Sequence, residues 1–300
     1  MKPFDQLKAQ LNIRCPSLAV LEQEPLSRHT SFRIGGPAAL MALPADREQA
    51  VLAARVAAEL GIQPFFMGNG SNLLVPDEGV DRFIIKTSAM RACSVEGGVI
   101  TADSGITLAR LATFAREHSL TGLEFAHGIP GTLGGAVTMN AGAYGGEMAQ
   151  VVREVTCLTH DGKIETVTEF DFGYRRSVFS DGSRLILGAS MELAPGHADE
   201  IGARMEELAQ QRRSKQPLEY PSAGSMFKRP EGYFAAALID QCGLKGLTVG
   251  DAQVSEKHAG FVINRGQATC ADILHLVEQV KARVQAETGV ELEMEVRVLR

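Results

Sequence analysis

The sequence predicts an α+β protein of two or three domains, from its length, its apolar content and its mixed periodicity. The chain has 300 residues, of which 45% are hydrophobic, and domains usually hold about 100–200 residues. Apolar residues recur with helical spacing in some segments and with strand alternation in others. We expect three regions, comprising residues 1–80, 81–195 and 196–300.

The first region predicts a β–α–β unit that ends in a glycine-rich turn. Residues 38–44 (AALMALP) are expected to form a strand. Residues 46–60 follow as a helix, with Asp46 near its start and Gly61 at its C-terminal boundary. Residues 64–68 (PFFMG) then read as a buried strand.

The second region continues the alternation of strands and helices. Strands are expected near FIIK and VITAD, followed by a helix over residues 107–118. Residues 151–167 predict a hairpin around Asp161-Gly162, because Asp-Gly suits a tight β-turn. The segment 192–200 (ELAPGHADE) is a candidate boundary.

The last region predicts an amphipathic helix followed by a closing strand. Residues 270–288 carry apolar side chains at helical spacing, with Thr269 and Asp272 as a capping box and Gly289 as the C-terminal cap. Residues 290–298 (VELEMEVRV) alternate strictly, which predicts one strand with an apolar face and a face of three glutamates.

Composition excludes several classes of function. The net charge of −6 and the pI of about 5.7 argue against a nucleic-acid partner. No apolar run reaches the ~18–20 residues that span a membrane, and no signal-peptide core occurs at the N-terminus, so we expect a cytoplasmic protein. Five scattered cysteines and seven dispersed histidines show no metal-ligand spacing, so we expect free thiols and no metal.

Two glycine-rich segments are candidates for cofactor binding. In FFMGNGSNLLV (65–75), a strand runs into a turn whose glycines let the backbone approach a ligand and whose N–H groups could hold a pyrophosphate; an ordinary tight turn is the alternative. The segment 122–148 contains eight glycines, which indicates backbone packed against a large flat or phosphorylated ligand. Its apolar residues are too numerous for the alternative, a flexible loop.

Three further segments carry polar groups whose roles the residues alone leave open. The paired arginines of FGYRRSVF (172–179) suit a carboxylate or phosphate, or are a surface pair. A serine of YPSAGSMFKRP (220–230) could donate a proton or cap a helix starting near Gly232. The glutamate face of the last strand could be catalytic or merely solvated, and spacing does not choose among its members.

Six motifs in order resemble the family of UDP-N-acetylenolpyruvoylglucosamine reductases. They are HTSFRIGG (29–36), MGNGSNLLV (67–75), GIPGTLGGAVTMNAGAYG (128–145), FGYRRSVF (172–179), AGSMFK (223–228) and LEMEVR (292–297). The resemblance implies a two-subdomain FAD-binding fold of the vanillyl-alcohol-oxidase type plus a C-terminal α/β substrate domain. Residues 1–80 and 81–195 would be the FAD-binding subdomains, and residues 196–300 the UDP-sugar domain.

The resemblance also implies the site residues and the reaction. Arg175, Ser225 and Glu295 correspond to the catalytic residues, and Tyr174, Lys215 and Lys228 to substrate-binding positions. The expected residues around non-covalent FAD are Arg33, Gly68, Asn69, Gly70, Ser71, Asn72, Leu73, Gly128, Ile129, Pro130, Gly131, Thr132, Gly134, Gly135, Ala136, Asn140, Ala141, Gly142 and Ala143. NADPH would give a hydride to FAD, and reduced flavin would pass it to the enolpyruvyl group of a UDP-linked amino sugar.

The chain departs from some members of the family. Arg229 follows the lysine of AGSMFK where some relatives have asparagine, and about fifty residues between Arg175 and Ser225 leave no room for an inserted tyrosine loop. The chain is therefore similar to the shorter class, and we expect a monomer. Two other functions stay open: an oxidase of small alcohols or sugars on the same fold, and a non-catalytic nucleotide-sugar binding protein.

Overall fold

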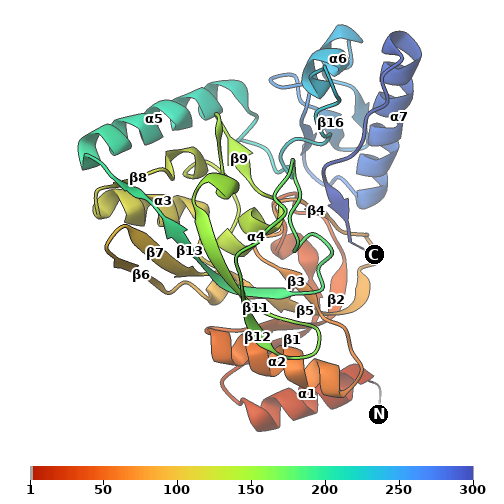
Figure 1. Cartoon of the computed structure of the whole chain (residues 1–300). Helices are drawn as coiled ribbons and strands as arrows, with labels where there is room; N and C mark the ends of the chain where they lie inside the picture. Colours follow the sequence, from red (N-terminus) through yellow and green to blue (C-terminus); the bar gives the residue numbers. More distant parts are fainter. Residues whose placement is uncertain (1–2, 300) are drawn as a thin grey trace. The chain divides into compact units, whose positions relative to one another are not determined.

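The computed structural model describes residues 3–299, which form two compact units (Figure 1). The first unit takes in the residues up to Glu22, Leu40–Asn69 and Arg82–Gln211. The second takes in Gln23–Ala39, Gly70–Asp81 and the residues from Arg212 onward. Met1, Lys2 and Arg300, at the ends of the predicted first and third domains, lie outside the described residues.

Two sheets form the frame of the first unit. A four-stranded sheet, most of whose residues belong to this unit, has the order β1 (Ala19–Pro25), β2 (Pro37–Leu43), β5 (Val80–Lys86), β3 (Phe65–Met67). A five-stranded sheet has the order β12 (Ile164–Val167), β11 (Val152–Leu158), β13 (Leu185–Glu192), β7 (Val99–Asp103), β6 (Cys93–Glu96). The antiparallel pairing of β11 with β12 confirms the predicted hairpin.

Helices α1 (Pro3–Arg14) and α2 (Arg47–Glu59) share a core with the four-stranded sheet. The predicted start of α2 is confirmed, because the side chain of Asp46 accepts a hydrogen bond from the Gln49 N–H at 2.8 Å. The predicted end is confirmed as well, since Gly61 has φ +68°, a left-handed conformation that favours glycine. Strand β3 then runs parallel to β5, and the glycine-rich turn follows it directly.

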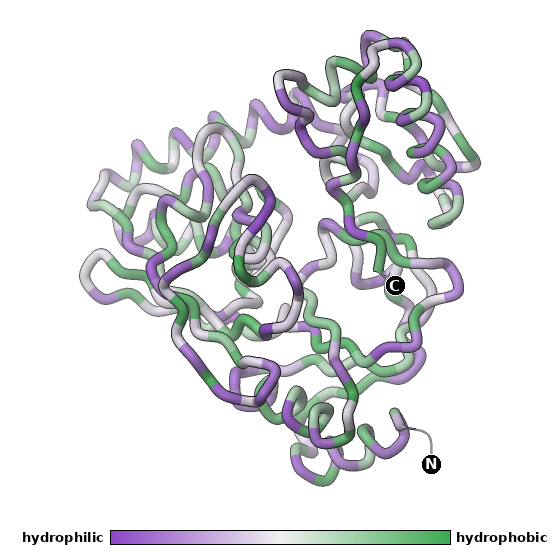
Figure 2. Tube along the Cα trace, turned by 45° about the vertical axis from the view of Figure 1, so that its right-hand side comes forward, coloured by the Kyte–Doolittle hydropathy of each residue, from purple (hydrophilic) through white to green (hydrophobic). Residues whose placement is uncertain are grey.

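Helices α3 (Leu108–Glu117), α4 (Leu133–Thr138) and α5 (Ala198–Lys215) pack on the core of the five-stranded sheet. The expected helix over residues 107–118 is confirmed as α3, with Thr107 as its cap. Long α5 is largely hydrophilic (Figure 2) and buries Ile201, Met205 and Leu208. Two short pairs, β8 (Leu120–Thr121) with β14 (Ala194–Pro195) and β9 (Gly142–Ala143) with β10 (Gly146–Glu147), complete the unit.

The second unit has its own core, built on α6 (Ala235–Gln241), α7 (Cys270–Thr288) and a three-stranded sheet. The sheet has the order β15 (Thr248–Val249), β16 (Ala252–Val254), β17 (Val262–Asn264). The prediction for α7 is confirmed in detail. Thr269 and Asp272 form a capping box, Gly289 is left-handed, and the apolar stripe is fully buried.

The prediction of one closing strand over residues 290–298 is wrong. Only β18 (Arg297–Val298) is a strand, and it pairs in parallel with β4 (Leu73–Leu74). Before it, the Lys228 N–H donates to the Glu293 carbonyl and the Glu295 N–H donates to the Met226 carbonyl, each at 2.9 Å. The segment therefore changes partners halfway along, which interrupts a regular ladder although the alternation of its side chains would allow one.

Candidate functional site

The glycine-rich turn after β3 lies against the start of α4 in the first unit. A Cβ atom on Gly68 would collide with the hydroxyl of Thr132. The Gly134 N–H donates to the Ser104 carbonyl at 2.8 Å, and a Cβ atom on Gly134 would meet the Ser104 Cβ at 3.0 Å. Glycine at both positions therefore allows three separate chain segments to meet at close range.

Two hydroxyl groups at this meeting point have no hydrogen-bond partner among the described residues. They are Ser104 Oγ and Thr132 Oγ1, and each residue is only 1% exposed. A buried hydroxyl without a partner costs about 1–3 kcal/mol. A ligand rich in acceptor oxygens would satisfy both groups. These residues thus fit the diphosphate of FAD.

Ser104 was not among the residues predicted from the sequence. It follows β7 directly, in the turn Asp103-Ser104-Gly105. A polar residue and a glycine after a buried strand are the signal that could have found it, because such turns often hold ligand-binding groups. Lys86 is a second buried polar residue that was not predicted. It ends β5 opposite Met67, and burial lowers the pKa of its ammonium group.

The rest of the predicted cofactor segment winds from a loop through α4 into a tight hairpin. Gly128, Ile129 and Pro130 precede α4, and Ile129 packs against the core of the first unit. Within and after α4, Gly135 is exposed and Ala136 is buried. The Ala141–Ala143 stretch then leads into β9. Two other predicted cofactor residues belong to the first unit: Asn69 follows Gly68 in the turn, and the Gly131 carbonyl accepts from the Leu108 N–H at 3.1 Å.

Asn140 ties this segment to the predicted catalytic arginine. It is buried with φ +42°, its Oδ1 accepts from the Ala149 N–H at 2.9 Å, and its Nδ2 donates to the Gly173 carbonyl at 3.2 Å. Gly173 and Arg176 exchange two backbone hydrogen bonds, so Tyr174 and Arg175 occupy the tip of a tight turn. The structure therefore brings the FGYRRS motif onto the glycine-rich segment.

The two arginines of that turn differ in their surroundings. Arg176 forms an exposed ion pair with Asp171 at 3.3 Å. Arg175 is half-buried, has φ +55° and lies over the ring of the exposed Tyr174, at 5.2 Å from its centre. A non-glycine residue held in the left-handed region costs free energy and is concentrated at functional sites. This contrast favours Arg175 over Arg176 as the functional arginine.

In the second unit, the segments of Ser225 and Glu295 lie side by side. Met226 and Phe227 are buried and anchor the first segment, whose Met226 carbonyl accepts from the Glu295 N–H at 2.9 Å. Asn72 Nδ2 donates to the Glu295 carbonyl at 3.1 Å. The segments that carry Ser225, Glu295 and Asn72 are thus joined by hydrogen bonds, and Ser225 itself is exposed.

The three glutamates of the closing segment are no longer equivalent. Glu291 and Glu293 are exposed, and Glu293 forms an ion pair with Lys228, itself half-buried. Glu295 is half-buried, which is unusual for a carboxylate on a merely solvated face. The alternative in which Ser225 caps the following helix is wrong, because α6 begins at Ala235 and its N-cap is Phe234.

The HTSFRIGG motif reaches the same part of the second unit. Ser31 Oγ donates to the Ser222 carbonyl at 2.7 Å, and the Ser31 N–H donates to the Gly70 carbonyl at 3.4 Å. Arg33 follows with φ +55°, another strained non-glycine position. Ser71 and Leu73 belong to the segment that begins at Gly70. Lys215 is exposed in the last turn of α5.

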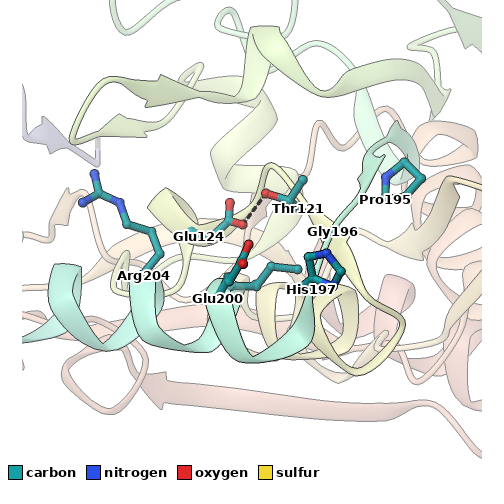
Figure 3. Close-up of a pocket in the computed structure, with 8 residues that line it drawn as sticks. Thr121, Glu124, Pro195, Gly196, His197, Glu200 and Arg204 are labelled. Atoms are coloured by element: carbon teal, nitrogen blue, oxygen red, sulfur yellow. Dashed lines mark hydrogen bonds between the residues drawn. The ribbon is translucent and has the colours of Figure 1, made fainter.

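A pocket of about 600 Å³ lies elsewhere in the first unit (Figure 3). Glu124, which accepts from the Thr121 hydroxyl at 2.6 Å, lines it together with His197, Glu200 and Arg204. None of the predicted site residues lines it. Across residues 3–299, no group of three or more acidic, histidine or cysteine side chains could hold a metal ion, and no helix could span a membrane.

Comparison with known proteins agrees with this geometry. Residues 38–168 match the family described as FAD binding domain, and residues 216–299 match UDP-N-acetylenolpyruvoylglucosamine reductase, C-terminal domain. Reductases of that name from Caldanaerobacter subterraneus and Agathobacter rectalis are 47% and 48% identical. Alignment covers 92% of both chains in the first case and 95% of both in the second.

A solved structure supports the same assignment of fold. The crystal structure of UDP-N-acetylenolpyruvylglucosamine reductase from Thermus caldophilus is 37% identical and has a TM-score of 0.82. The match covers 94% of this chain and 100% of the other. The expected α+β class, with an FAD-binding domain and a separate C-terminal reductase domain, is therefore confirmed.

Proposed function

The chain belongs to the UDP-N-acetylenolpyruvoylglucosamine reductase family, and from this premise we propose that it reduces UDP-N-acetylglucosamine enolpyruvate to UDP-N-acetylmuramate. It is an FAD-dependent oxidoreductase of peptidoglycan precursor synthesis that uses NADPH. The observation that carries this proposal is the 47% identity, over 92% of both chains, to a reductase of that name. We further propose a cytoplasmic monomer.

The first unit offers groups that would hold the cofactor. Ser104 and Thr132 would donate to the diphosphate through hydroxyl groups that have no hydrogen-bond partner among the described residues, and Gly68 lets the turn after β3 lie against Thr132. When bound, FAD supplies the redox chemistry, carrying a hydride between NADPH and the sugar. In the second unit, the segment from Gly70 to Leu73 and the strained Arg33 are proposed to bind the cofactor as well.

The proposed catalytic residues stabilise charge and deliver a proton. Hydride addition to the terminal vinyl carbon places negative charge on the neighbouring carbon and its carboxylate. Arg175 would stabilise that charge with its guanidinium, and Glu295 would act through a hydrogen bond to the same group, as preorganised electrostatics requires. Ser225, exposed beside Glu295 on the paired segment, would give its proton to the carbon. Tyr174, Lys215 and Lys228 are proposed to bind substrate.

Two measurements test this function. The purified protein should show the absorbance of a non-covalent flavin, released by denaturation, and should turn over NADPH continuously only when the enolpyruvyl sugar is present. A preparation that takes up no FAD, or that oxidises NADPH at the same rate with and without the sugar, would refute the proposal. Steady oxygen consumption with a small alcohol or sugar would instead identify an oxidase.

A further inference from the structure

A partly buried ion pair lies beside Ser104 in the first unit. The Nε atom of Arg47 donates to Asp103 Oδ1 at 2.6 Å, and Asp103 directly precedes Ser104 in the chain. The Asp103 side chain is only 8% exposed and that of Arg47 is 37% exposed. Exposed pairs such as Arg153 with Glu192, whose side chains are 52% and 60% exposed, contribute little to stability. Burial therefore sets the Arg47–Asp103 pair apart from them.

The Asp103 carboxylate has a structural role of its own. Its Oδ2 atom accepts from the Ala92 N–H at 3.1 Å, and the Asp103 N–H donates to the Ala92 carbonyl at 2.8 Å. The carboxylate thus holds the loop that leads into β6 against the end of β7. This bond requires an acceptor oxygen, and the oxygen that the chain uses carries a negative charge.

Arg47 is placed for this carboxylate and not for its own helix. It is the first residue of α2, where a cation opposes the helix dipole. A Cβ atom on Gly188 would collide with the Arg47 guanidinium, and Gly188 lies opposite Asp103 in the pairing of β13 with β7. Strand β13 therefore leaves the space that the guanidinium occupies, and this space lies next to the carboxylate.

The charge of Asp103 matters because an anion is proposed to bind at the next residue. The Ser104 hydroxyl is buried, has no hydrogen-bond partner among the described residues and fits a phosphate oxygen. Because consecutive Cα atoms are about 3.8 Å apart, a phosphate group held by Ser104 would lie on the order of 10 Å from the Asp103 carboxylate. Salt screens buried charges at that separation only weakly. An uncompensated carboxylate would therefore repel the diphosphate.

We infer that Arg47 is a positioning residue of the cofactor site, which acts through Asp103 by offsetting the charge of its carboxylate. The carboxylate keeps its bond to Ala92, and the guanidinium lowers the repulsion that a neighbouring anion meets. This inference rests on the proposed function, since the anion is the diphosphate of FAD. It assigns Arg47 no contact with FAD, so the loss of its charge acts on FAD affinity only through Asp103.

The test is fluorescence titration of the apoprotein with FAD, with urea unfolding of each variant alongside. Arg47→Gln keeps a donor for the carboxylate and removes the positive charge. FAD binding should therefore weaken roughly 10- to 20-fold, as for unit charges about 10 Å apart at an effective dielectric constant of about 20. Arg47→Lys keeps the charge and should bind FAD nearly as tightly as the wild type. Arg153→Gln breaks an exposed ion pair of the same unit and is the matched control, which should leave FAD affinity unchanged.

A double variant separates this role from a purely structural one. Addition of Asp103→Asn to Arg47→Gln removes the negative charge as well, so it should restore most of the lost FAD affinity. If Arg47 served only to hold the fold together, the second substitution would bring no recovery. That result would overturn the inference, as would an unchanged FAD affinity in Arg47→Gln.

Asp103→Asn by itself provides the deciding measurement if Arg47→Gln does not fold. Its apoprotein should be less stable, because the carboxylate no longer serves both Arg47 and Ala92, yet it should bind FAD at least as tightly as the wild type. Weaker binding would overturn the inference. The proposed function is tested separately by the wild type. A wild type that takes up no FAD refutes that function, whereas a wild type that binds FAD without recovery in the double variant refutes only the inference.

Discussion

Replacement of Thr132 by valine should change the stability of the apoprotein and the affinity for FAD in opposite directions. Valine has nearly the shape of threonine and lacks only the hydroxyl. Thr132 Oγ1 is buried without a partner in the described residues. It also makes no side-chain capping bond to α4, so the substitution loses no helix cap.

The size of each effect follows from this environment. An unsatisfied buried hydroxyl costs about 1–3 kcal/mol, so the free energy of unfolding of the Thr132→Val apoprotein should rise by up to that amount. A hydrogen bond to a charged group contributes about 1.5–3 kcal/mol, so the loss of a donor to the diphosphate should weaken FAD binding roughly 10- to 150-fold.

The assay combines urea unfolding of the apoprotein with fluorescence titration of FAD. Thr113→Val is a matched control, because Thr113 Oγ1 in the same unit already donates to the Ala109 carbonyl at 2.9 Å. This control should leave the FAD affinity unchanged. Loss of apoprotein stability together with unchanged FAD affinity in Thr132→Val would refute the assignment of this hydroxyl to the cofactor.

Three further predictions concern other groups. Ser225→Ala should leave flavin reduction by NADPH unchanged in stopped-flow and slow reoxidation by the enolpyruvyl sugar by about 10²–10⁴-fold; slowing of both half-reactions alike would contradict a proton-donor role. Glu295→Ala should slow the same second half-reaction, whereas Glu291→Ala and Glu293→Ala should have little effect, and equal effects from all three would indicate a structural strand face. Burial lowers the pKa of Lys86 in the folded protein below the ordinary value of 10.5. Between these two pKa values the unfolded state binds more protons than the folded state, so the free energy of unfolding of the wild type should rise with pH in that range. Lys86→Met should be more stable than the wild type at neutral pH and should lack this rise, as measured by urea unfolding up to about pH 10. If the free energy of unfolding of the variant still rises with pH, Lys86 is not the cause of the rise.

Much of the fold could be predicted because its signals are local. The cap of α2 at Asp46, the capping box of α7 at Thr269 and the Asp161-Gly162 hairpin each depend on residues within a few positions of one another. Their geometry is set by short-range hydrogen bonds and by φ preferences. The same locality made the glycine-rich segments recognisable as ligand-binding candidates. The division into three domains and the roles of the site residues stay predictions.

The sequence by itself therefore determined the order and type of most elements and the motifs that identify the family. Tertiary structure alone decided which of two adjacent arginines is strained, because the turn at Arg175 is held by distant Asn140. It also revealed that the Ser104 hydroxyl has no hydrogen-bond partner among the described residues. It showed as well that the closing segment bonds first to residues 226–228 and then pairs with β4. These features arise from contacts between segments far apart in the chain, and no periodicity within one segment encodes which partner it meets.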